Sequence, residues 1–169
     1  MEEVYLLLGS NKGDRERFLY EAINRIEELC SEKAIVSRIY ESEPWGFDSK
    51  TWFLNIALKI CTGIEPRQLL IKLLEIERDL GRVRSENVNG YESREIDIDI
   101  IFYGNRIINE ETLIIPHPRA HIRRFVLAPL CEISQDYIHP VFGEDLKTLL
   151  KNCSDHSLVT RHSAEVPHV

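Results

Sequence analysis

The 169-residue chain has no stretch approaching 18 uninterrupted apolar residues, so it offers no transmembrane helix. It has only four cysteines, about 22 to 70 residues apart, and neither a C-x-x-C pair nor histidines at metal-ligand spacing. This predicts free, buried thiols in a reducing compartment. The first residues, MEEVYLLLGSNKGD, open with acids and soon meet a Gly-Ser-Asn turn, unlike a signal peptide. We therefore expect a cytoplasmic protein. The cysteines are Cys30, Cys61, Cys131 and Cys153.

The sequence also lacks G-x-x-x-x-G-K-[ST] and the D-F-G set, which excludes a P-loop protein and a protein kinase. A net charge of −7 argues against a general binder of nucleic acids or membrane surfaces. Lysine is absent from positions 73 to 146, although seven arginines stand from Arg82 to Arg124. Because guanidinium groups make planar, bidentate contacts with phosphate, this bias predicts a phosphorylated ligand.

The apolar pattern predicts an α+β fold of one domain. Short apolar or alternating runs indicate strands, and a 3.6-residue period indicates helices, one starting at Pro66 and stopping at Gly81. Gly104-Asn105 predicts a turn into a short return strand. The order β-α-β-β-α-β is that of a ferredoxin-like sandwich, in which both helices cover one face of an antiparallel sheet. We expect strands at 4–8, 34–40, 53–61 and 96–103, and helices at 14–30 and 66–80.

Polar side chains gather on the sheet face that this fold leaves open. Ile96, Ile98, Ile100 and Phe102 form the apolar side of the last strand, so Asp97 and Asp99 share the opposite side. Two carboxylates on one strand face, roughly 6.6 Å apart by strand rise, repel each other. They are, however, the hard oxygen ligands that Mg²⁺ prefers when phosphates and waters complete its shell. The pair therefore predicts a metal site.

The strand at 53–61 adds two more candidates to the open face. Leu54, Ile56 and Leu58 point to the helices, so Phe53 and Asn55 point the other way. Because a buried amide is costly without a partner, we interpret Asn55 as a ligand-binding residue. His117 lies between two prolines, outside regular structure, which favours a functional role. We interpret 9–11 as a structural cap of the first helix.

Six segments carry a family resemblance, in the right order and spacing from residue 4 to about 150. They resemble the 6-hydroxymethyl-7,8-dihydropterin pyrophosphokinases, which have a ferredoxin-like fold with the active site on the open sheet face. The segments are LGSNKGD at 8–14, YESEPWG at 40–46, FLNIALKI at 53–60, GRVR at 81–84, SREIDIDIIFYGN at 93–105 and IPHPRAHIRRFVLAPLCEI at 115–133.

The resemblance implies transfer of pyrophosphate from ATP to 6-hydroxymethyl-7,8-dihydropterin in folate synthesis. Asp97 and Asp99 would hold two Mg²⁺ ions and, with Arg82 and Arg94, form the catalytic set. The implied ATP-binding residues are Glu77, Arg84, Arg94, Ile100, Leu113, Ile114, His117 and Arg123. The implied pterin-binding residues are Ser42, Pro44, Trp45, Gly46, Phe53, Asn55 and Phe125.

Some positions depart from the family pattern, and two other functions stay open. The loop 82–94 has NVNGYES where a shorter sequence with Trp-Gly-Pro is common, and Pro118 follows His117 where an aromatic is frequent. We expect this loop to act as a lid. The alternatives are another D-x-D nucleotidyl transferase and a non-catalytic ferredoxin-like binding module. We expect a monomeric catalytic domain at 1–150, followed by a frayed tail of unknown role at 151–169.

Overall fold

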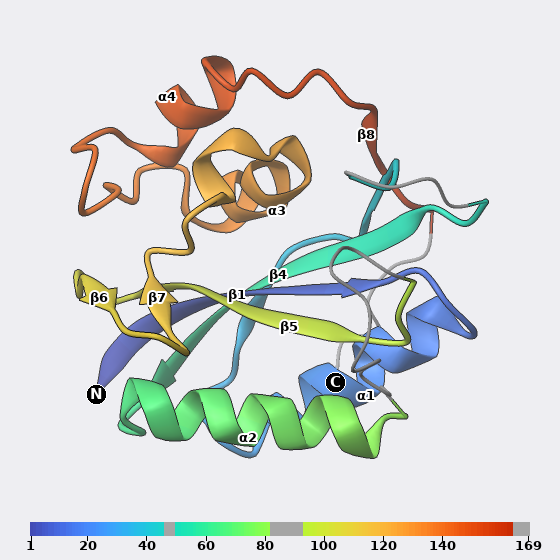
Figure 1. Ribbon diagram of the computed structural model, residues 1–169, viewed down its shortest axis with the longest axis horizontal. Helices are drawn as coiled ribbons and strands as arrows, with labels where there is room; N and C mark the ends of the chain where they lie inside the picture. The colour runs from blue at the N-terminus through green and yellow to red at the C-terminus, as the bar shows by residue number, and fades with distance from the viewer. Residues whose placement is uncertain (46–49, 82–92, 164–169) are drawn as a thin grey trace.

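A six-stranded antiparallel sheet forms the centre of the computed structural model (Figure 1). Its main strands run in the order β5 (Asp97–Tyr103), β1 (Glu2–Ser10), β4 (Phe53–Thr62), β3 (Tyr40–Ser42) and β8 (Val159–Arg161). The short strand β2 (Ile35–Val36) pairs with β4 further along the same edge as β3. The structure describes residues 1–45, 50–81 and 93–163. The predicted antiparallel sheet is confirmed.

Helices α1 (Arg15–Glu27) and α2 (Pro66–Asp79) lie together on one face of this sheet (Figure 1). Asp14 caps α1 by accepting a hydrogen bond from the backbone N–H of Arg17. α2 starts at its proline and ends before Gly81, whose φ of 97° suits glycine. The expected stripes of both helices pack on the even-numbered side chains of β1 and β4, among them Leu6 and Ile56. The two-helix layer is therefore as predicted.

A second layer covers part of the opposite face, which the sequence interpretation left open. It consists of α3 (Arg124–Ser134) and α4 (Leu146–Lys151), preceded by the 3₁₀ turn η1 (Ala120–Ile122). Leu127 and Leu130 of α3 share a buried cluster with Tyr5, Leu7 and Ala57 of the sheet. Because β1 is apolar on both faces, each face needs a cover. The prediction of a fully open sheet face was therefore wrong, and Asn55, Asp97 and Asp99 lie outside the cluster that α3 and α4 cover.

A β-bulge changes the direction of the side chains along β5. Leu6 pairs with Ile100, but the next pair toward the N-terminus joins Tyr5 to Phe102, so the register skips Ile101. Ile101 and Phe102 consequently belong to the cluster under α3, whereas Ile96, Ile98 and Ile100 face α1 and α2. The prediction that Phe102 shares a face with the three isoleucines was wrong. The prediction for Asp97 and Asp99 is unaffected, because both precede the bulge.

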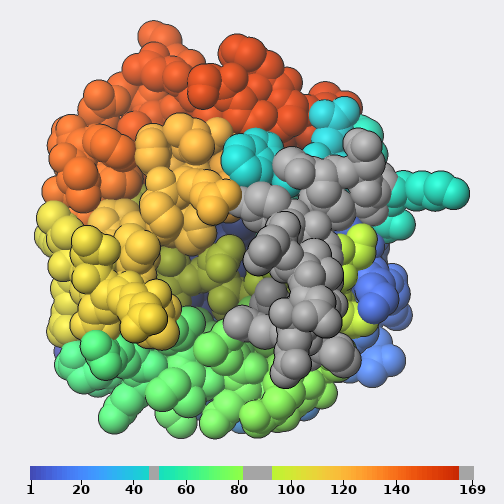
Figure 2. Space-filling model, in the orientation of Figure 1, coloured from blue at the N-terminus to red at the C-terminus, as the bar shows by residue number. Residues whose placement is uncertain are grey.

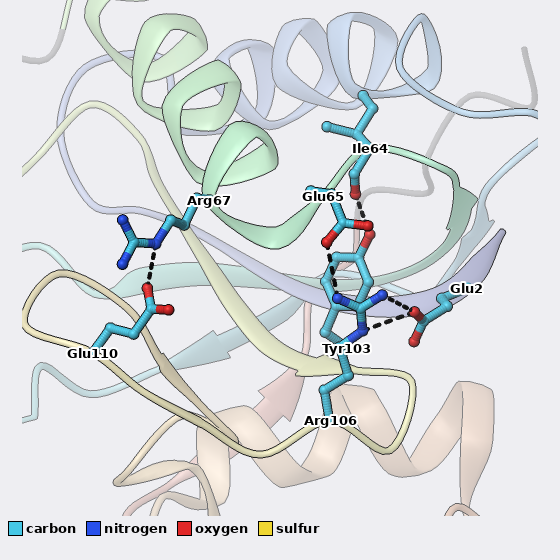
Figure 3. A network of polar contacts seen from close by, with 7 residues as sticks. All are labelled: Glu2, Ile64, Glu65, Arg67, Tyr103, Arg106 and Glu110. Atoms are coloured by element: carbon cyan, nitrogen blue, oxygen red, sulfur yellow. Dashed lines mark hydrogen bonds and ion pairs between the residues drawn. The ribbon is translucent and has the colours of Figure 1, made fainter.

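The chain leaving β5 does not form the expected return strand on β5. Gly104 N–H donates to the Glu3 carbonyl at 2.7 Å, which continues the pairing with β1 instead. Strand β6 (Ile108–Asn109) pairs with β7 (Ile114–Ile115) in a separate two-stranded sheet. Arg106 holds this exit by bonding Glu2 and, at 3.0 Å, Glu65 before α2 (Figure 3). The same figure shows Tyr103 bonding the Ile64 carbonyl and Arg67 paired with Glu110.

The remaining departures from expectation concern the β3 edge and the thiols. The strand expected at 34–40 is two short strands, β2 and β3. The described part of the tail that was expected to fray contains β8, which pairs with β3 over Tyr40–Ser42. All four cysteines are free, but only Cys153 is buried and the other three are half-buried. Within the described residues, no helix is both long and apolar enough to cross a membrane.

We expect His139 to make stability depend on pH. It is 3% exposed, and its Nδ1 accepts hydrogen bonds from the N–H groups of Val141 and Phe142. Burial, with a smaller contribution from the charge on His121, lowers the pKa of His139 to about 4. Between about pH 6.5 and 4, His139 is therefore protonated in the unfolded state but neutral in the folded state. Stability should be lost as pH falls through this window, by up to roughly 3 kcal/mol.

His139→Asn tests this expectation, since the asparagine oxygen can accept the same two backbone hydrogen bonds without titrating. Urea unfolding from pH 7.5 to 4.5 should give a shallower loss of unfolding free energy for this variant than for wild type. The slope should not vanish, because burial also lowers the pKa of His117. His156→Asn, which changes an exposed histidine, is the control. Parallel slopes for wild type and His139→Asn would contradict the assignment.

Candidate functional site

The strand register places the polar candidates in one row across the sheet. Gly9 pairs with Asn55 of β4 on one side and with Asp97 of β5 on the other. Next to this row, Leu7 pairs with Asp99. A Cβ built on Gly9 would lie 3.3 Å from Asn55 Oδ1 and 3.6 Å from Phe53 Cδ1. The missing side chain thus leaves a flat strip between the amide and the carboxylates.

Gly9 and Asn11 were not among the predicted site residues, and their interpretation as the cap of α1 was wrong, because Asp14 is the cap. Asn11 instead holds the approach to β5. Its Oδ1 accepts from Arg94 N–H at 2.8 Å, and its own N–H donates to the Arg94 carbonyl at 3.2 Å. The signal available in the sequence was a glycine inside an apolar strand, which marks close approach of another group.

Asn55 is 2% exposed and has a partner within the protein. Its Nδ2 donates to Ser42 Oγ at 2.8 Å, which fixes the orientation of the amide. Ser42 ends β3, and the chain then leads through Pro44 to Trp45. The structure therefore joins two of the predicted pterin-binding residues directly.

An arginine lies close to two aromatic rings near the end of β3. The guanidinium of Arg123, at the start of α3, lies 4.5 Å from the centre of the Trp45 ring and 5.8 Å from that of Phe125. Arg123 is 6% exposed, whereas Trp45 and Phe125 are half-buried. Such stacking keeps the cation in place without neutralising it. Predicted residues from the ATP and pterin groups thus meet at this point.

The two aspartates sit in an acidic environment that nearby arginines partly balance. Arg94 Nη1 lies 2.7 Å from Asp97 Oδ2, and both side chains are largely buried. Burial, followed by the charges of Asp97 and Glu77, raises the pKa of Asp99 to about 7, against the opposing effect of Arg94 and Arg123. A cation close to Asp99 would stabilise the ionised form of this carboxyl group.

Glu77 lies behind β5 rather than in solvent. It is 2% exposed, and its Oε1 accepts from the N–H of Ile98 at 2.7 Å. Ile98 stands between the two aspartates on the outer strand of the sheet, so this bond fixes the strand segment that carries them.

A pocket of about 240 Å³ opens beside Asp99. Figure 2 shows the surface hollowed here, between α2 in green and the yellow stretch that leads to α3. Four predicted ATP-binding residues line it, namely Ile100, Leu113, Ile114 and His117. The apolar side chains of Ile100, Leu113 and Ile114 suit a flat aromatic ring.

His117 enters this pocket as a neutral imidazole. Burial, then the charges of Arg123 and Arg119, lowers the pKa of His117 to about 4. Its Nδ1 accepts from the N–H of Arg119 at 3.2 Å, which places the remaining ring proton on Nε2. His117 can therefore donate one hydrogen bond at neutral pH without carrying a charge.

Three predicted site residues, Gly46, Arg82 and Arg84, lie outside the described residues, as does most of the expected lid. Among the described ranges, no group of three or more histidine, cysteine or acidic side chains is arranged to enclose a metal ion. Asp97 and Asp99 form a pair instead. That arrangement suits Mg²⁺ shared with substrate phosphates, which needs only one or two protein carboxylates.

A family model and several related proteins match the sequence of this chain. Residues 5–135 match the model of the 7,8-dihydro-6-hydroxymethylpterin-pyrophosphokinases. The chain is 41% identical to an Aquifex aeolicus 2-amino-4-hydroxy-6-hydroxymethyldihydropteridine pyrophosphokinase, over 87% of this chain and 89% of that one. It is 43% identical to the folic acid synthesis protein fol1 of Pneumocystis carinii, over 93% of this chain but only 21% of that longer one.

A solved structure shares the fold. A Plasmodium falciparum HPPK-DHPS, crystallised with pterin and p-hydroxybenzoate, superposes with a TM-score of 0.71 over 89% of this chain and 43% of that one, at 16% identity. The sequence matches agree with the geometry of the site, in which an antiparallel sheet brings together an amide, two carboxylates and an apolar pocket. The chain belongs to the 7,8-dihydro-6-hydroxymethylpterin pyrophosphokinases, the enzymes that transfer pyrophosphate from ATP to hydroxymethyldihydropterin in folate synthesis.

Proposed function

We propose that the chain carries out this transfer on the row formed by Asn55, Gly9 and Asp97. The observation that carries the proposal is the register, which sets a side-chain-free strip between a fixed amide and an acidic pair. A flat heterocycle can lie on such a strip with its hydroxymethyl group toward the carboxylates. The element order β1, α1, β3, β4, α2, β5 supports a ferredoxin-like frame for this site.

The pterin half of the proposed site is the part around Asn55 that would bind the pterin. The Asn55 amide would bind the polar edge of the pterin, while Phe53 and Phe125 would contact the two ring faces. Ser42 supports this role because it holds the amide at 2.8 Å in a defined orientation. The chain beyond Ser42 would close over the ring through Pro44, Trp45 and Gly46.

The ATP half follows from the pocket beside Asp99. Ile100, Leu113 and Ile114 would contact the adenine, and His117 would donate a hydrogen bond from Nε2. Glu77 would act on this half through the backbone of Ile98. The arginines proposed to bind the phosphates are Arg82, Arg84, Arg94 and Arg123.

Asp97 and Asp99 fit a magnesium site, and we propose that they hold two Mg²⁺ ions. When bound, magnesium would neutralise phosphate charge and lower the pKa of the acceptor hydroxyl. In the reaction the hydroxymethyl oxygen bonds to the β-phosphorus and loses its proton, while the bond from that phosphorus to the AMP oxygen breaks. The protein positions the two substrates and balances the charge that moves to AMP.

The Arg94–Asp97 ion pair leads to a prediction about metal binding. Because Arg94 Nη1 already lies 2.7 Å from Asp97 Oδ2, it competes with a cation for that carboxylate. Arg94→Ala should tighten Mg²⁺ binding to the substrate-free protein by several-fold, yet lower kcat by roughly 10-fold or more through loss of a phosphate contact. Calorimetric Mg²⁺ titration and steady-state kinetics measure the two effects. Weaker metal binding with normal turnover would contradict both roles.

The experiment that tests the function is product analysis with ATP, Mg²⁺ and 6-hydroxymethyl-7,8-dihydropterin. We expect AMP and the pterin diphosphate in equal amounts, and chelation of the metal should stop their formation. A ferredoxin-like binding module would release no nucleotide product. A D-x-D nucleotidyl transferase would release pyrophosphate instead of AMP.

A further inference from the structure

The C-terminal segment lies against the β3 edge of the proposed pterin half. Strand β8 pairs with β3 so that Val159 is opposite Ser42 and Arg161 is opposite Tyr40. Beyond β8, His162 N–H donates to the Ile39 carbonyl at 2.8 Å. The backbone of Ser42, whose hydroxyl orients Asn55, is therefore held in the sheet by a strand more than a hundred residues away.

Side chains of α1 contact both the C-terminal segment and the chain around β3. The His162 ring nitrogen Nε2 lies 2.8 Å from Glu16 Oε1 on α1. Arg15 Nη1 donates to Glu41 Oε1 at 3.0 Å and to the Trp52 carbonyl at 2.7 Å. These contacts fix where the connection from β3 to β4 begins and ends.

The same C-terminal segment also caps α3 through Asp155. Its Oδ2 accepts from the N–H of Arg124, the first residue of α3, at 2.9 Å, and its Oδ1 accepts from Ser157 N–H at 2.9 Å. The residue at the usual capping position, Arg123, provides no side-chain cap of its own. Although partial burial opposes it, the hydrogen bonds from Ser157 and Arg124 lower the pKa of Asp155. The carboxylate thus stays ionised at a helix N-terminus, where negative charge is stabilising.

The start of α3 and the segment that follows β3 both contribute side chains to one stacked group, formed by Trp45, Arg123 and Phe125. Arg123 precedes α3, Phe125 lies in its first turn, and Trp45, 4.5 Å from the Arg123 guanidinium, follows β3. A shift of either element would change the space between them. Asp155 fixes the first element, and β8 fixes the second.

We propose that Asp155 is a positioning residue for the pterin, holding the first turn of α3 against the β3 edge that β8 completes. The family match ends at residue 135, so this segment lies beyond it. The proposal rests on the proposed function, because that function assigns Trp45 and Phe125 to the pterin half. It predicts that loss of the Asp155 carboxylate weakens pterin binding selectively.

The test compares Asp155→Ala with Asp145→Ala, which removes an equivalent cap elsewhere. Asp145 Oδ1 accepts from Thr148 N–H at 2.7 Å at the start of α4, and no predicted site residue lies on α4. Both variants should lower the melting temperature by similar amounts. Pterin affinity is measured with saturating α,β-methylene-ATP and Mg²⁺, and the affinity for that analogue is measured alone. Asp155→Ala should bind pterin about tenfold more weakly, or about 1.4 kcal/mol, and should lose clearly less affinity for the analogue, whose phosphates are proposed to contact three further arginines besides Arg123.

Equal pterin affinities for the two variants and wild type would overturn the proposal, because the cap would then be structural only. Equal weakening in both variants would overturn it too, since affinity would follow general stability. A comparable loss of analogue affinity in Asp155→Ala would show that the residue does not act on the pterin half. If wild-type protein released no AMP, the proposed function itself would fail, and that result is read without any variant.

Discussion

Replacing Asp97 or Asp99 with asparagine should lower kcat by at least ~10²-fold while the protein stays folded. Both carboxylates point from β5 into the site, and neither belongs to the two buried clusters that hold the layers together. An amide of the same shape keeps the packing but removes a charged ligand for the proposed Mg²⁺ ions. Burial and neighbouring acids raise the pKa of Asp99, so its ionised form is costly in the free protein. Asp99→Asn should therefore not reduce stability near neutral pH.

The measurement is AMP formation at saturating Mg²⁺, with Asp136→Asn as the matched control. Asp136 is exposed just after α3, away from Asp97 and Asp99 in the sequence and outside the proposed site. It should retain wild-type turnover. Near-normal AMP formation by either β5 variant would exclude this metal site.

Asn55→Ala should weaken pterin binding by about 1–3 kcal/mol, roughly 5- to 150-fold, with little effect on ATP. The variant removes the group proposed to match the pterin edge. It also leaves the buried Ser42 Oγ without its donor, so some loss of stability is expected as well.

Ser37→Ala separates that stability loss from recognition. Ser37 is buried at the same sheet edge, and its Oγ accepts from Ala57 N–H at 2.9 Å, two residues beyond Asn55 on β4. The control therefore removes a buried hydrogen bond to the same strand without touching the proposed pterin contact. Weakening of pterin and ATP to the same extent by Asn55→Ala would show that Asn55 is structural.

The parts of the fold that the sequence predicted are those with strong local periodicity. α1 and α2 each carry one apolar stripe, and Leu54, Ile56 and Leu58 of β4 share one face of their strand. Alternation alone therefore placed Asn55, Asp97 and Asp99 on the same side of the sheet. The register, which no local pattern contains, was needed to show that Gly9 separates Asn55 from Asp97.

The parts that were missed depend on contacts between distant segments. A bulge at Ile101 breaks the alternation of β5, and nothing in the run of isoleucines marks it. The cover provided by α3 follows from the apolar side chains on both faces of β1, a signal that strand prediction alone does not use. The C-terminal segment has little apolar pattern, and its order comes from pairing with β3 and from Asp155. Family resemblance supplied the roles of the arginines and the pocket residues, which periodicity could not.

Labelled ATP shows whether the pyrophosphoryl group passes intact to the pterin. Wild-type protein is incubated with Mg²⁺, 6-hydroxymethyl-7,8-dihydropterin and ATP labelled with ³²P at either the α or the γ position. We predict that the γ label appears in the pterin product and the α label only in AMP, at equal rates. Appearance of the α label in the pterin product, or formation of ADP with a monophosphorylated pterin, would contradict the account.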